Sequence, residues 1–269
     1  MKLSVVIPFY NEENMIQKMY DELVKEINQI TKAEFEIIFI NDGSKDRTFE
    51  RMLAIAAGDS RVKYISFSRN FGKEAGTIAG LEYATGEAVI LMDGDLQHPP
   101  AMLPKMIEAY EQGYDVVSAR RTRTGEKRHR TFLAKHFYKL ANKMMDIELM
   151  DGVSEFRLFS RKVVNAIISM QEYNRFSKGI FAWIGFNEKV IEYENQVRTV
   201  GETKYSLKFS LNYAIQGILS FNDKPLRMCI NFGLFCLLIS LVYVLWTFIQ
   251  YLVVPDSLVS GYFTTIFSV

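Results

Sequence analysis

The stretch AVILMDGDLQHPP, residues 88–100, decides the fold of this chain. An apolar run over 88–92 ends abruptly at Asp93-Gly94-Asp95. This pattern predicts a buried strand that carries two carboxylates to the carboxyl edge of a sheet, where α/β proteins place their ligands. Two carboxylates there indicate a metal site, although a D-G-D triplet alone is also typical of an ordinary turn after a strand.

Strand and helix patterns alternate on both sides of this stretch. Apolar runs predict strands at residues 3–8, 35–40, 62–67 and 115–119, and helical spacing predicts helices at 15–30, 48–57, 73–85 and 99–112. Further along, the same patterns predict a helix at 132–145, a strand at 156–159, helices at 163–170 and 176–184, and a strand at 190–194. This alternation is typical of a doubly wound, mostly parallel α/β sheet.

Three glycines, Gly72, Gly76 and Gly80, lie four residues apart at the start of the third predicted helix and within it, on one helical face. A phosphate-binding glycine loop is one interpretation of that spacing. Small residues four apart also let a helix pack closely on its neighbour, and we favour this interpretation. Neither GxGxxG nor GxxxxGK[ST] occurs in the chain, so both a dinucleotide-binding Rossmann site and a P-loop lose support.

The bulk composition restricts the class of protein. The 269 residues can form one sizeable domain and a smaller appendage, and a net charge of +1 argues against a nucleic-acid binder. The two cysteines, Cys229 and Cys236, lie in one apolar tract, which excludes a disulfide framework and indicates a reducing compartment. The first apolar run is too short for a signal peptide, so we expect the body of the protein in the cytosol.

A membrane span is predicted near the end of the chain. No charged residue occurs from Met228 to Val254, about 27 residues, which is long enough to cross a hydrocarbon core of about 30 Å. Lys224 and Arg227 precede this tract, so the positive-inside rule places the globular body on the cytoplasmic side. We predict four parts: a cytoplasmic catalytic domain at 1–205, a juxtamembrane amphipathic segment at 206–226, a transmembrane helix at 227–254, and a turn with the start of a truncated second transmembrane helix at 255–269.

Three segments beside this span have alternative interpretations. The apolar tail at 255–269 is the start of that second helix or a short interfacial segment. The basic segment TRTGEKRHR, residues 122–130, is a solvated surface loop or a mobile loop near an anionic substrate or lipid. Apolar residues recur at helical spacing over 207–218, which favours an interfacial helix.

Eight motifs in this order resemble those of the family 2 glycosyltransferases. The motifs are FYNEE (9–13), NDGS (41–44), SRNFGKEAG (68–76), DGDLQHPP (93–100), EFRLFSR (155–161), NRFSKGIFAWIGF (174–186), GETKYSL (201–207) and FNDKPLR (221–227). Within that family, the chain is similar to the bacterial polyprenyl-phosphate glycosyltransferases, relatives of dolichol-phosphate mannose synthase. The resemblance covers essentially the whole chain, and such proteins usually carry two transmembrane helices.

The resemblance implies a nucleotide-sugar-binding domain of the GT-A type with a DxD-like motif, followed by juxtamembrane and transmembrane helices. It implies inverting transfer of a single hexose, GlcNAc or glucose, from a UDP-sugar to undecaprenyl phosphate at the cytoplasmic membrane face. The product would be a lipid-phosphate-sugar donor for cell-envelope glycosylation. We expect the lipid bilayer as a further partner, leave a homo-oligomer open, and favour UDP-GlcNAc as the donor.

The resemblance also assigns site residues. Carboxylate and amide oxygens suit a hard cation, so Mg²⁺ or Mn²⁺ is expected on Asp93, Asp95 and Gln97, whereas His98 is left out of the metal set because imidazole suits Mg²⁺ poorly. Nucleotide-binding residues are expected at the ends of the first strands and at the DxD-like motif, and cations are expected around the acceptor phosphate. The first group is Pro8, Tyr10, Glu12, Asp42, Arg69, Lys73 and Asp93, and the second is Arg120, Arg157, Arg175, Lys178, Arg198 and Lys204.

Several of these residues have simpler interpretations. Glu12 could complement the dipole of the following helix, and each cation taken alone could be a solvated surface charge. Glu155, which we assign with Asp95 to catalysis, stands where relatives usually have Asp before Phe-Arg-Leu. We hypothesise that Glu155 orients the sugar or the acceptor near the anomeric carbon, so that Glu155→Gln loses turnover while nucleotide binding survives.

Two other functions stay open at this point. One is a membrane-anchored glycosyltransferase that acts on a polysaccharide or another acceptor. The other is a non-enzymatic, nucleotide-sugar-binding membrane scaffold, for which a broken metal motif would be the sign. The carboxylates of the DxD-like motif are intact in this chain.

Overall fold

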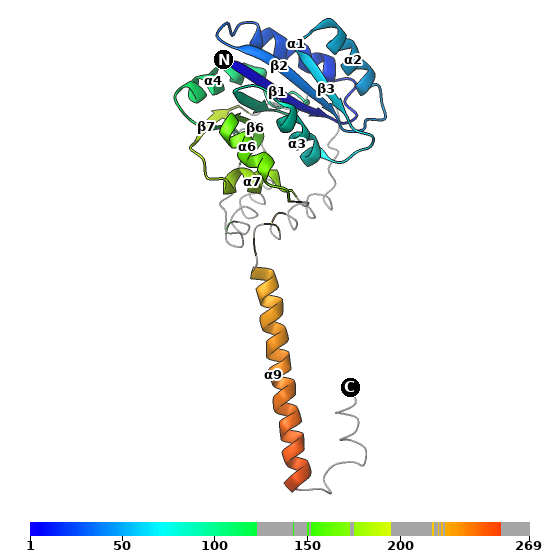
Figure 1. Ribbon diagram of the computed structural model, residues 1–269, viewed down its shortest axis with the longest axis vertical. Coiled ribbons are helices and arrows are strands. Elements are labelled where there is room, and N and C mark those ends of the chain that lie inside the picture. Colours follow the sequence, from blue (N-terminus) through cyan, green and yellow to red (C-terminus); the bar gives the residue numbers. More distant parts are fainter. Residues whose placement is uncertain are drawn as a thin grey trace. The chain divides into compact units, whose positions relative to one another are not determined.

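Seven strands form one mixed sheet in the computed structural model, which describes residues 1–122, 152–172, 175–194 and 224–253 together with residues 142, 150, 217, 220 and 222 (Figure 1). The order across the sheet is β3-β2-β1-β4-β6-β5-β7, and β6 is antiparallel to both of its neighbours while the other pairings are parallel. The strands are β1 (Lys2–Phe9), β2 (Glu34–Asn41), β3 (Val62–Ser66), β4 (Ala88–Leu91), β5 (Val116–Arg121), β6 (Val153–Ser160) and β7 (Glu188–Tyr193). The prediction of a mostly parallel α/β sheet is confirmed.

Helices cover both faces of this sheet. One buried apolar cluster joins the sheet to α1, α2 and α4, and a second joins it to α3, α6 and α7. The helices are α1 (Ile16–Ile27), α2 (Thr48–Gly58), α3 (Lys73–Tyr83), α4 (Leu103–Glu111), α6 (Arg161–Ser169) and α7 (Ser177–Trp183), with a 3₁₀ turn, η1 (Pro100–Met102), before α4. Two cores, one on each side, are what a doubly wound sheet produces.

The glycines of α3 divide between two roles. A Cβ added at Gly80 would lie 2.2 Å from Val6 Cγ1, and one at Gly76 would lie 3.4 Å from Pro8 Cβ. Close packing of α3 on β1 is therefore confirmed for these two positions. The prediction of close packing is wrong for Gly72. This residue precedes the helix, has a φ of +94°, and has no atom within 4 Å of an added Cβ. Gly72 is there because this backbone conformation disfavours residues with a side chain.

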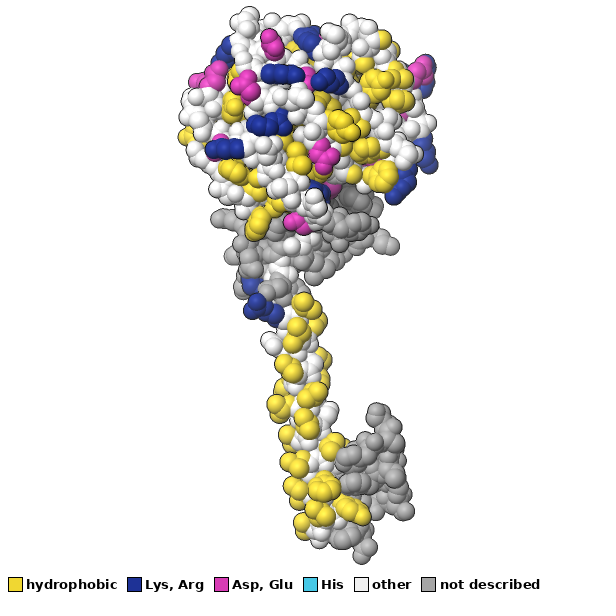
Figure 2. All heavy atoms as spheres, in the orientation of Figure 1, with side chains coloured by type: hydrophobic (Ala, Val, Ile, Leu, Met, Phe, Trp, Pro, Cys, Tyr) yellow, Lys and Arg dark blue, Asp and Glu magenta, His cyan; other side chains and the backbone are white. Residues whose placement is uncertain are grey.

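The chain divides into two units, Met1–Phe221 and Asn222–Val269. Within the second unit, α9 (Lys224–Val253) is a continuous helix, and Figure 2 shows hydrophobic side chains along its visible face. In the described part of the chain, it is the one helix that is long and apolar enough to cross a membrane. Other segments with predictions lie outside the described residues: the basic loop from residue 123, all but residue 142 of the helix at 132–145, most of the juxtamembrane segment, and the tail from residue 254.

Candidate functional site

Antiparallel pairing of β4 with β6 brings two acidic residues together at the carboxyl edge of the parallel strands. Ala88 pairs with Ser160, and Leu91 pairs with Arg157. The same register, continued two residues beyond the last pair, sets Asp93 opposite Glu155. The two residues come from distant parts of the sequence, and the direction of β6 is what makes them neighbours.

The Lys73 ammonium joins these two carboxylates. Its Nζ lies 2.5 Å from Asp93 Oδ1 and 2.7 Å from Glu155 Oε2. Lys73 is the first residue of α3, so the start of that helix points its cation at the ends of β4 and β6. We call Lys73, Asp93 and Glu155 the central charge cluster.

Burial and charge act in opposite directions within this cluster. Burial alone would lower the pKa of Lys73, but the charges of Asp93 and Glu155 outweigh it and hold the pKa above its usual range. Burial alone would raise the pKa of Asp93, but nearby cations, among them Lys73 and Lys178, outweigh it and leave the pKa below its usual range. At neutral pH, the ammonium and the carboxylate of Asp93 are therefore both charged.

His98 supports the backbone of Asp93. Its Nδ1 accepts a hydrogen bond of 3.0 Å from the Asp93 backbone N–H, and its ring stacks on Phe156 with 5.2 Å between ring centroids. Burial lowers the pKa of His98, although the neighbouring Asp93 opposes this shift, so the imidazole is neutral at neutral pH. His98 thus holds Asp93 in place, a role that the sequence analysis missed because the separation of five residues matches no ligand spacing.

The residues expected to bind a metal offer few ligands of their own. Asp93 is bound to Lys73, and Asp95 Oδ1 accepts a hydrogen bond of 3.1 Å from the Gln97 backbone N–H. Over the residues that the structure describes, no three Asp, Glu, His or Cys side chains are grouped to hold a metal. Two carboxylates nevertheless fit Mg²⁺ or Mn²⁺ when substrate phosphates complete the coordination, and the ammonium beside Asp93 shows that this position favours a cation.

The expected nucleotide positions lie at the same edge, after β1 and β2. Pro8 pairs with Ile40 and Phe9 pairs with Asn41 in the parallel register, so Tyr10 and Asp42 follow the two strands side by side. Backbone N–H groups after β1 are bound by side chains after β2: the N–H of Asn11 donates to Ser44 Oγ and that of Glu12 donates to Thr48 Oγ1. The two loops therefore form one connected surface.

Asp42 ties this surface to the loop that precedes α3. Its Oδ1 accepts a 2.7 Å hydrogen bond from the Phe71 N–H, and its Oδ2 accepts bonds of 2.9 Å and 2.8 Å from the Gly72 N–H and the Asn70 side chain. Burial raises the pKa of Asp42, and the two backbone hydrogen bonds oppose that shift. Asp42 thus holds the loop that delivers Lys73. Arg69, in the same loop, is exposed and lies over the Phe71 ring at 3.9 Å.

The predicted acceptor cations fall into different environments. Lys178 acts electrostatically on Asp93, as described above. Arg120 pairs with Glu192 on the neighbouring strand β7, and the buried Arg157 pairs with Glu188 at 3.2 Å. Arg175 donates a hydrogen bond to the Met170 carbonyl. Arg198 and Lys204 lie outside the described residues.

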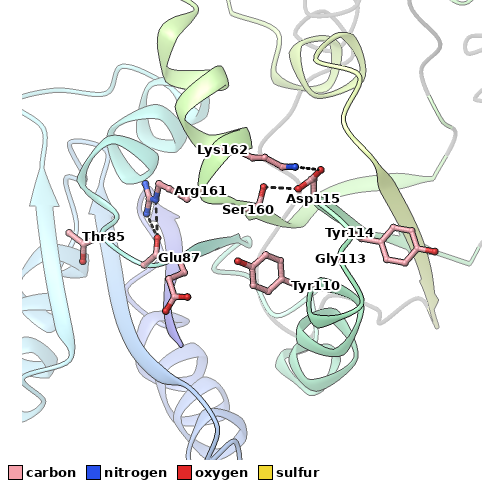
Figure 3. Close-up of a pocket in the computed structure, with 10 residues that line it drawn as sticks. Thr85, Glu87, Tyr110, Gly113, Tyr114, Asp115, Ser160, Arg161 and Lys162 are labelled. Atoms are coloured by element: carbon pink, nitrogen blue, oxygen red, sulfur yellow. Dashed lines mark hydrogen bonds and ion pairs between the residues drawn. The ribbon is translucent and has the colours of Figure 1, made fainter.

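A pocket of about 850 Å³ lies at the opposite edge of the sheet (Figure 3). It is lined by residues that precede β4 and β5 and by residues that follow the antiparallel β6. Its two cations bind groups of the pocket wall: Arg161 donates to the Gly86 carbonyl, and Lys162 pairs with Asp115 at 2.7 Å. The chemistry-bearing residues therefore lie at the other end of the strands, and that carboxyl edge is the candidate active site.

Comparisons with known proteins show the family of this chain. The model of glycosyl transferase family 2 matches residues 4–168, which include the central charge cluster. The chain is 49% identical to the putative glycosyltransferase CsbB of Bacillus subtilis, covering 99% of this chain and 80% of that protein. It is 42% identical to the bactoprenol glucosyl transferase of Shigella phage SfX, covering 97% of this chain and 86% of that protein.

Solved structures support the fold. The glucosyl-3-phosphoglycerate synthase from Mycobacterium tuberculosis, crystallised with Mn²⁺ and UDP-glucose, superposes with a TM-score of 0.53 at 20% identity, covering 81% of this chain and 76% of that chain. The sheet order, the position of the charge cluster and the family match lead to one conclusion. This chain is a glycosyltransferase of the GT-A type and belongs to glycosyl transferase family 2.

Proposed function

We propose that this enzyme transfers one hexose, GlcNAc or glucose, from a UDP-sugar to undecaprenyl phosphate. The observation that carries the proposal is the central charge cluster at the carboxyl edge of the sheet, in a chain 42% identical to a bactoprenol glucosyl transferase over almost all of its length. Bactoprenol is a polyprenol, so that relative's name fits a lipid-linked acceptor.

The donor would lie across the loops after β1 and β2, with its diphosphate toward Asp93. Pro8, Tyr10, Glu12 and Asp42 would border the nucleoside, and Arg69 and Lys73 would lie nearest to its phosphates. Asp93, Asp95 and Gln97 would hold Mg²⁺ or Mn²⁺, which neutralises charge that develops on the leaving diphosphate. The Lys73 ammonium would stabilise the same negative charge on the diphosphate.

The reaction would proceed by direct displacement with inversion. An oxygen of the acceptor phosphate forms a bond to the anomeric carbon, and the bond from that carbon to the diphosphate breaks, with the electron pair leaving on UDP. A phosphomonoester has a second pKa of about 6, so the attacking oxygen is already anionic at neutral pH and needs no strong general base. Glu155 is therefore assigned to orientation of the sugar or the acceptor.

The lipid acceptor requires the enzyme to act at a membrane. The length and composition of α9 support an anchor in the cell membrane, and Lys224 and Arg227 at its start favour a catalytic unit on the cytoplasmic side. The product, a lipid-phosphate-sugar, would serve as a donor for glycosylation of the cell envelope.

The test supplies membranes containing the enzyme with labelled nucleotide sugars and undecaprenyl phosphate, with and without EDTA. We expect labelled lipid from UDP-GlcNAc or UDP-glucose, loss of that product in EDTA, and its recovery on addition of Mn²⁺ or Mg²⁺. A panel of UDP- and GDP-sugars identifies the donor.

Two variants give the experiment its control. Asp93→Asn removes a carboxylate of the central charge cluster and should abolish labelling, whereas Glu82→Gln changes an exposed residue of α3 and should not. Label in a polymer instead of the lipid would favour the polysaccharide acceptor. Nucleotide binding without any transfer would favour the scaffold, and either result would reject the proposal.

A further inference from the structure

The first turn of α3 contacts two separate parts of the protein. Lys73 reaches the carboxylates at the ends of β4 and β6, and the next residue, Glu74, reaches the start of α7. The nucleotide-binding and catalytic assignments above make no use of Glu74. Its contacts nevertheless join the central charge cluster to the helix that carries Lys178.

Glu74 binds Ser177, the first residue of α7, through both backbone and side chain. The Ser177 N–H lies 3.3 Å from Glu74 Oε1 and 3.1 Å from Oε2, and the Ser177 hydroxyl donates to the same carboxylate. Ser177 is only 4% exposed. The N–H groups of a first helical turn have no partner within the helix, so a half-buried carboxylate that accepts from one of them fixes where the helix begins.

The neighbour of Ser177 is Lys178, one of the cations expected around the acceptor phosphate. The contact between Glu74 and Ser177 places it beside the first turn of α3, where Lys73 binds Asp93, and its charge helps to lower the pKa of Asp93. Adjacent residues on α3 thus bind Asp93 and Ser177, so the start of α7 lies next to the residue that joins the two carboxylates. Lys73 is already bound to two carboxylates. Lys178 therefore adds a second positive charge on the α7 side of the central charge cluster.

We propose that Glu74 is a positioning residue, which holds α7 so that Lys178 is directed at the incoming acceptor phosphate. This inference rests on the proposed function, because it assumes an anionic acceptor. Glu74 contacts neither substrate in this scheme and acts on the acceptor through α7. Its loss should therefore raise the KM for the acceptor and leave donor binding unchanged.

The first experiment compares Glu74→Ala and Glu74→Gln with wild type in the full-length protein in nanodiscs. We expect the KM for undecaprenyl phosphate to rise about tenfold in Glu74→Ala, as the loss of a charge-assisted hydrogen bond implies, and less in Glu74→Gln, whose amide oxygen still accepts from Ser177. The dissociation constant for the UDP-sugar should not change. Glu82→Ala, on an exposed position of the same helix, is the matched control.

The second experiment separates positioning from a general structural role. If Glu74 acts through Lys178, then Glu74→Ala in a Lys178→Gln background should add nothing further to the KM for the acceptor. Independent, multiplying effects in the double variant would overturn the inference, as would an unchanged KM in Glu74→Ala. Ser177→Ala removes only the hydroxyl contact and should shift the same KM in the same direction by a smaller factor.

Hydrogen exchange tests the contact without any acceptor. In wild type, the Ser177 amide should exchange slowly, and Glu74→Ala should accelerate exchange over α7 while α6 stays protected. Unchanged exchange over α7 would overturn the inference even if the wild-type enzyme makes no labelled lipid. A different outcome combines faster exchange confined to α7 in Glu74→Ala with no labelled lipid from the wild-type enzyme. It would reject the proposed function, but it would still show that Glu74 holds α7.

Discussion

Glu155 shares the Lys73 ammonium with Asp93 and is 11% exposed at its side chain. Replacing it by glutamine keeps the shape and removes the charge. We expect Glu155→Gln to lower turnover by about 100-fold, because a misplacement of the reacting groups by about 1 Å has effects of this size. The affinity for the UDP-sugar should survive, since the nucleotide loops after β1 and β2 do not depend on Glu155.

Single-turnover transfer and calorimetric binding of UDP separate these two effects. Glu155→Asp is the informative companion, because it keeps the charge and shortens the reach to Lys73. Near-normal turnover in Glu155→Gln would show that the residue takes no part in the reaction. Equal losses of turnover and of UDP affinity would instead place Glu155 in the donor site.

Residue types and motifs were sufficient to select most members of the candidate site. Asp93 was predicted from the abrupt end of an apolar run, and Glu155 and Lys73 were selected by resemblance; their contacts were not predictable. The ion pairs of Lys73 join residues 73, 93 and 155, and no local pattern encodes such distances. Glu74 was missed for the same reason, because only the folded chain brings Ser177 near it. The role of His98 was missed because its separation of five residues from Asp93 matches no ligand spacing.

Close packing at the level of the helix is tested at Gly80. A methyl group there would lie 2.2 Å from Val6 Cγ1 and 3.0 Å from Ile40 Cδ1, so Gly80→Ala should lower the free energy of unfolding by about 1–3 kcal/mol. Gly76→Ala meets its nearest atom at 3.4 Å and should be neutral or stabilise by up to about 1 kcal/mol, the usual gain from alanine in a helix.

Urea unfolding followed by circular dichroism measures both variants. A Gly80→Ala variant as stable as wild type would mean that α3 can shift away from β1. In that case, activity should fall, because Lys73 begins the same helix.

Most elements of the sheet and its covering helices were predictable, since apolar runs and helical spacing are local properties. The direction of β6 was not. A short apolar strand gives the same pattern whether it runs parallel or antiparallel to its neighbours, and the choice depends on the chain between β5 and β6. That choice decides the site, because only an antiparallel β6 brings Glu155 to the edge where Asp93 follows the end of β4.

At the scale of the whole catalytic unit, the edge of the sheet opposite the candidate active site contains carboxylates whose charge stabilises the fold. The amino edge contains Glu36, which is buried and accepts hydrogen bonds from Ser4, Lys63 and Thr85. Burial alone would raise the pKa of Glu36, but these bonds outweigh it and hold the pKa well below its usual range. At Asp59, the Arg61 side chain lowers the pKa to about 2.

Both groups make the protein sensitive to acid. A carboxylate whose pKa is lower in the folded state stabilises the fold above its unfolded pKa, and that stabilisation is lost as the pH falls toward the folded pKa. We therefore expect the free energy of unfolding to decrease as the pH falls from about 4.5 toward 2. Glu36→Gln should cost about 3 kcal/mol at neutral pH and flatten this acid dependence.

Urea unfolding of the detergent-solubilised chain at a series of pH values measures this dependence. Glu22→Gln is the control, because its pair with Lys25 is exposed and contributes little. If Glu36→Gln unfolds with the same pH profile as wild type, the hydrogen bonds at the amino edge do not control acid stability.

The clamp at Asp42 has a consequence for the energetics of donor binding. Its hydrogen bonds to residues 70–72 fasten the loop before α3 to the loop after β2, and the backbone there is tight enough that a Cβ at Gly43 would lie 2.2 Å from the Arg69 carbonyl carbon. The ordering entropy of both loops is therefore lost on folding and not again on binding. A nucleotide that binds here meets a preorganised surface. The cost of ordering the loops therefore offsets little of the free energy that its contacts contribute to binding.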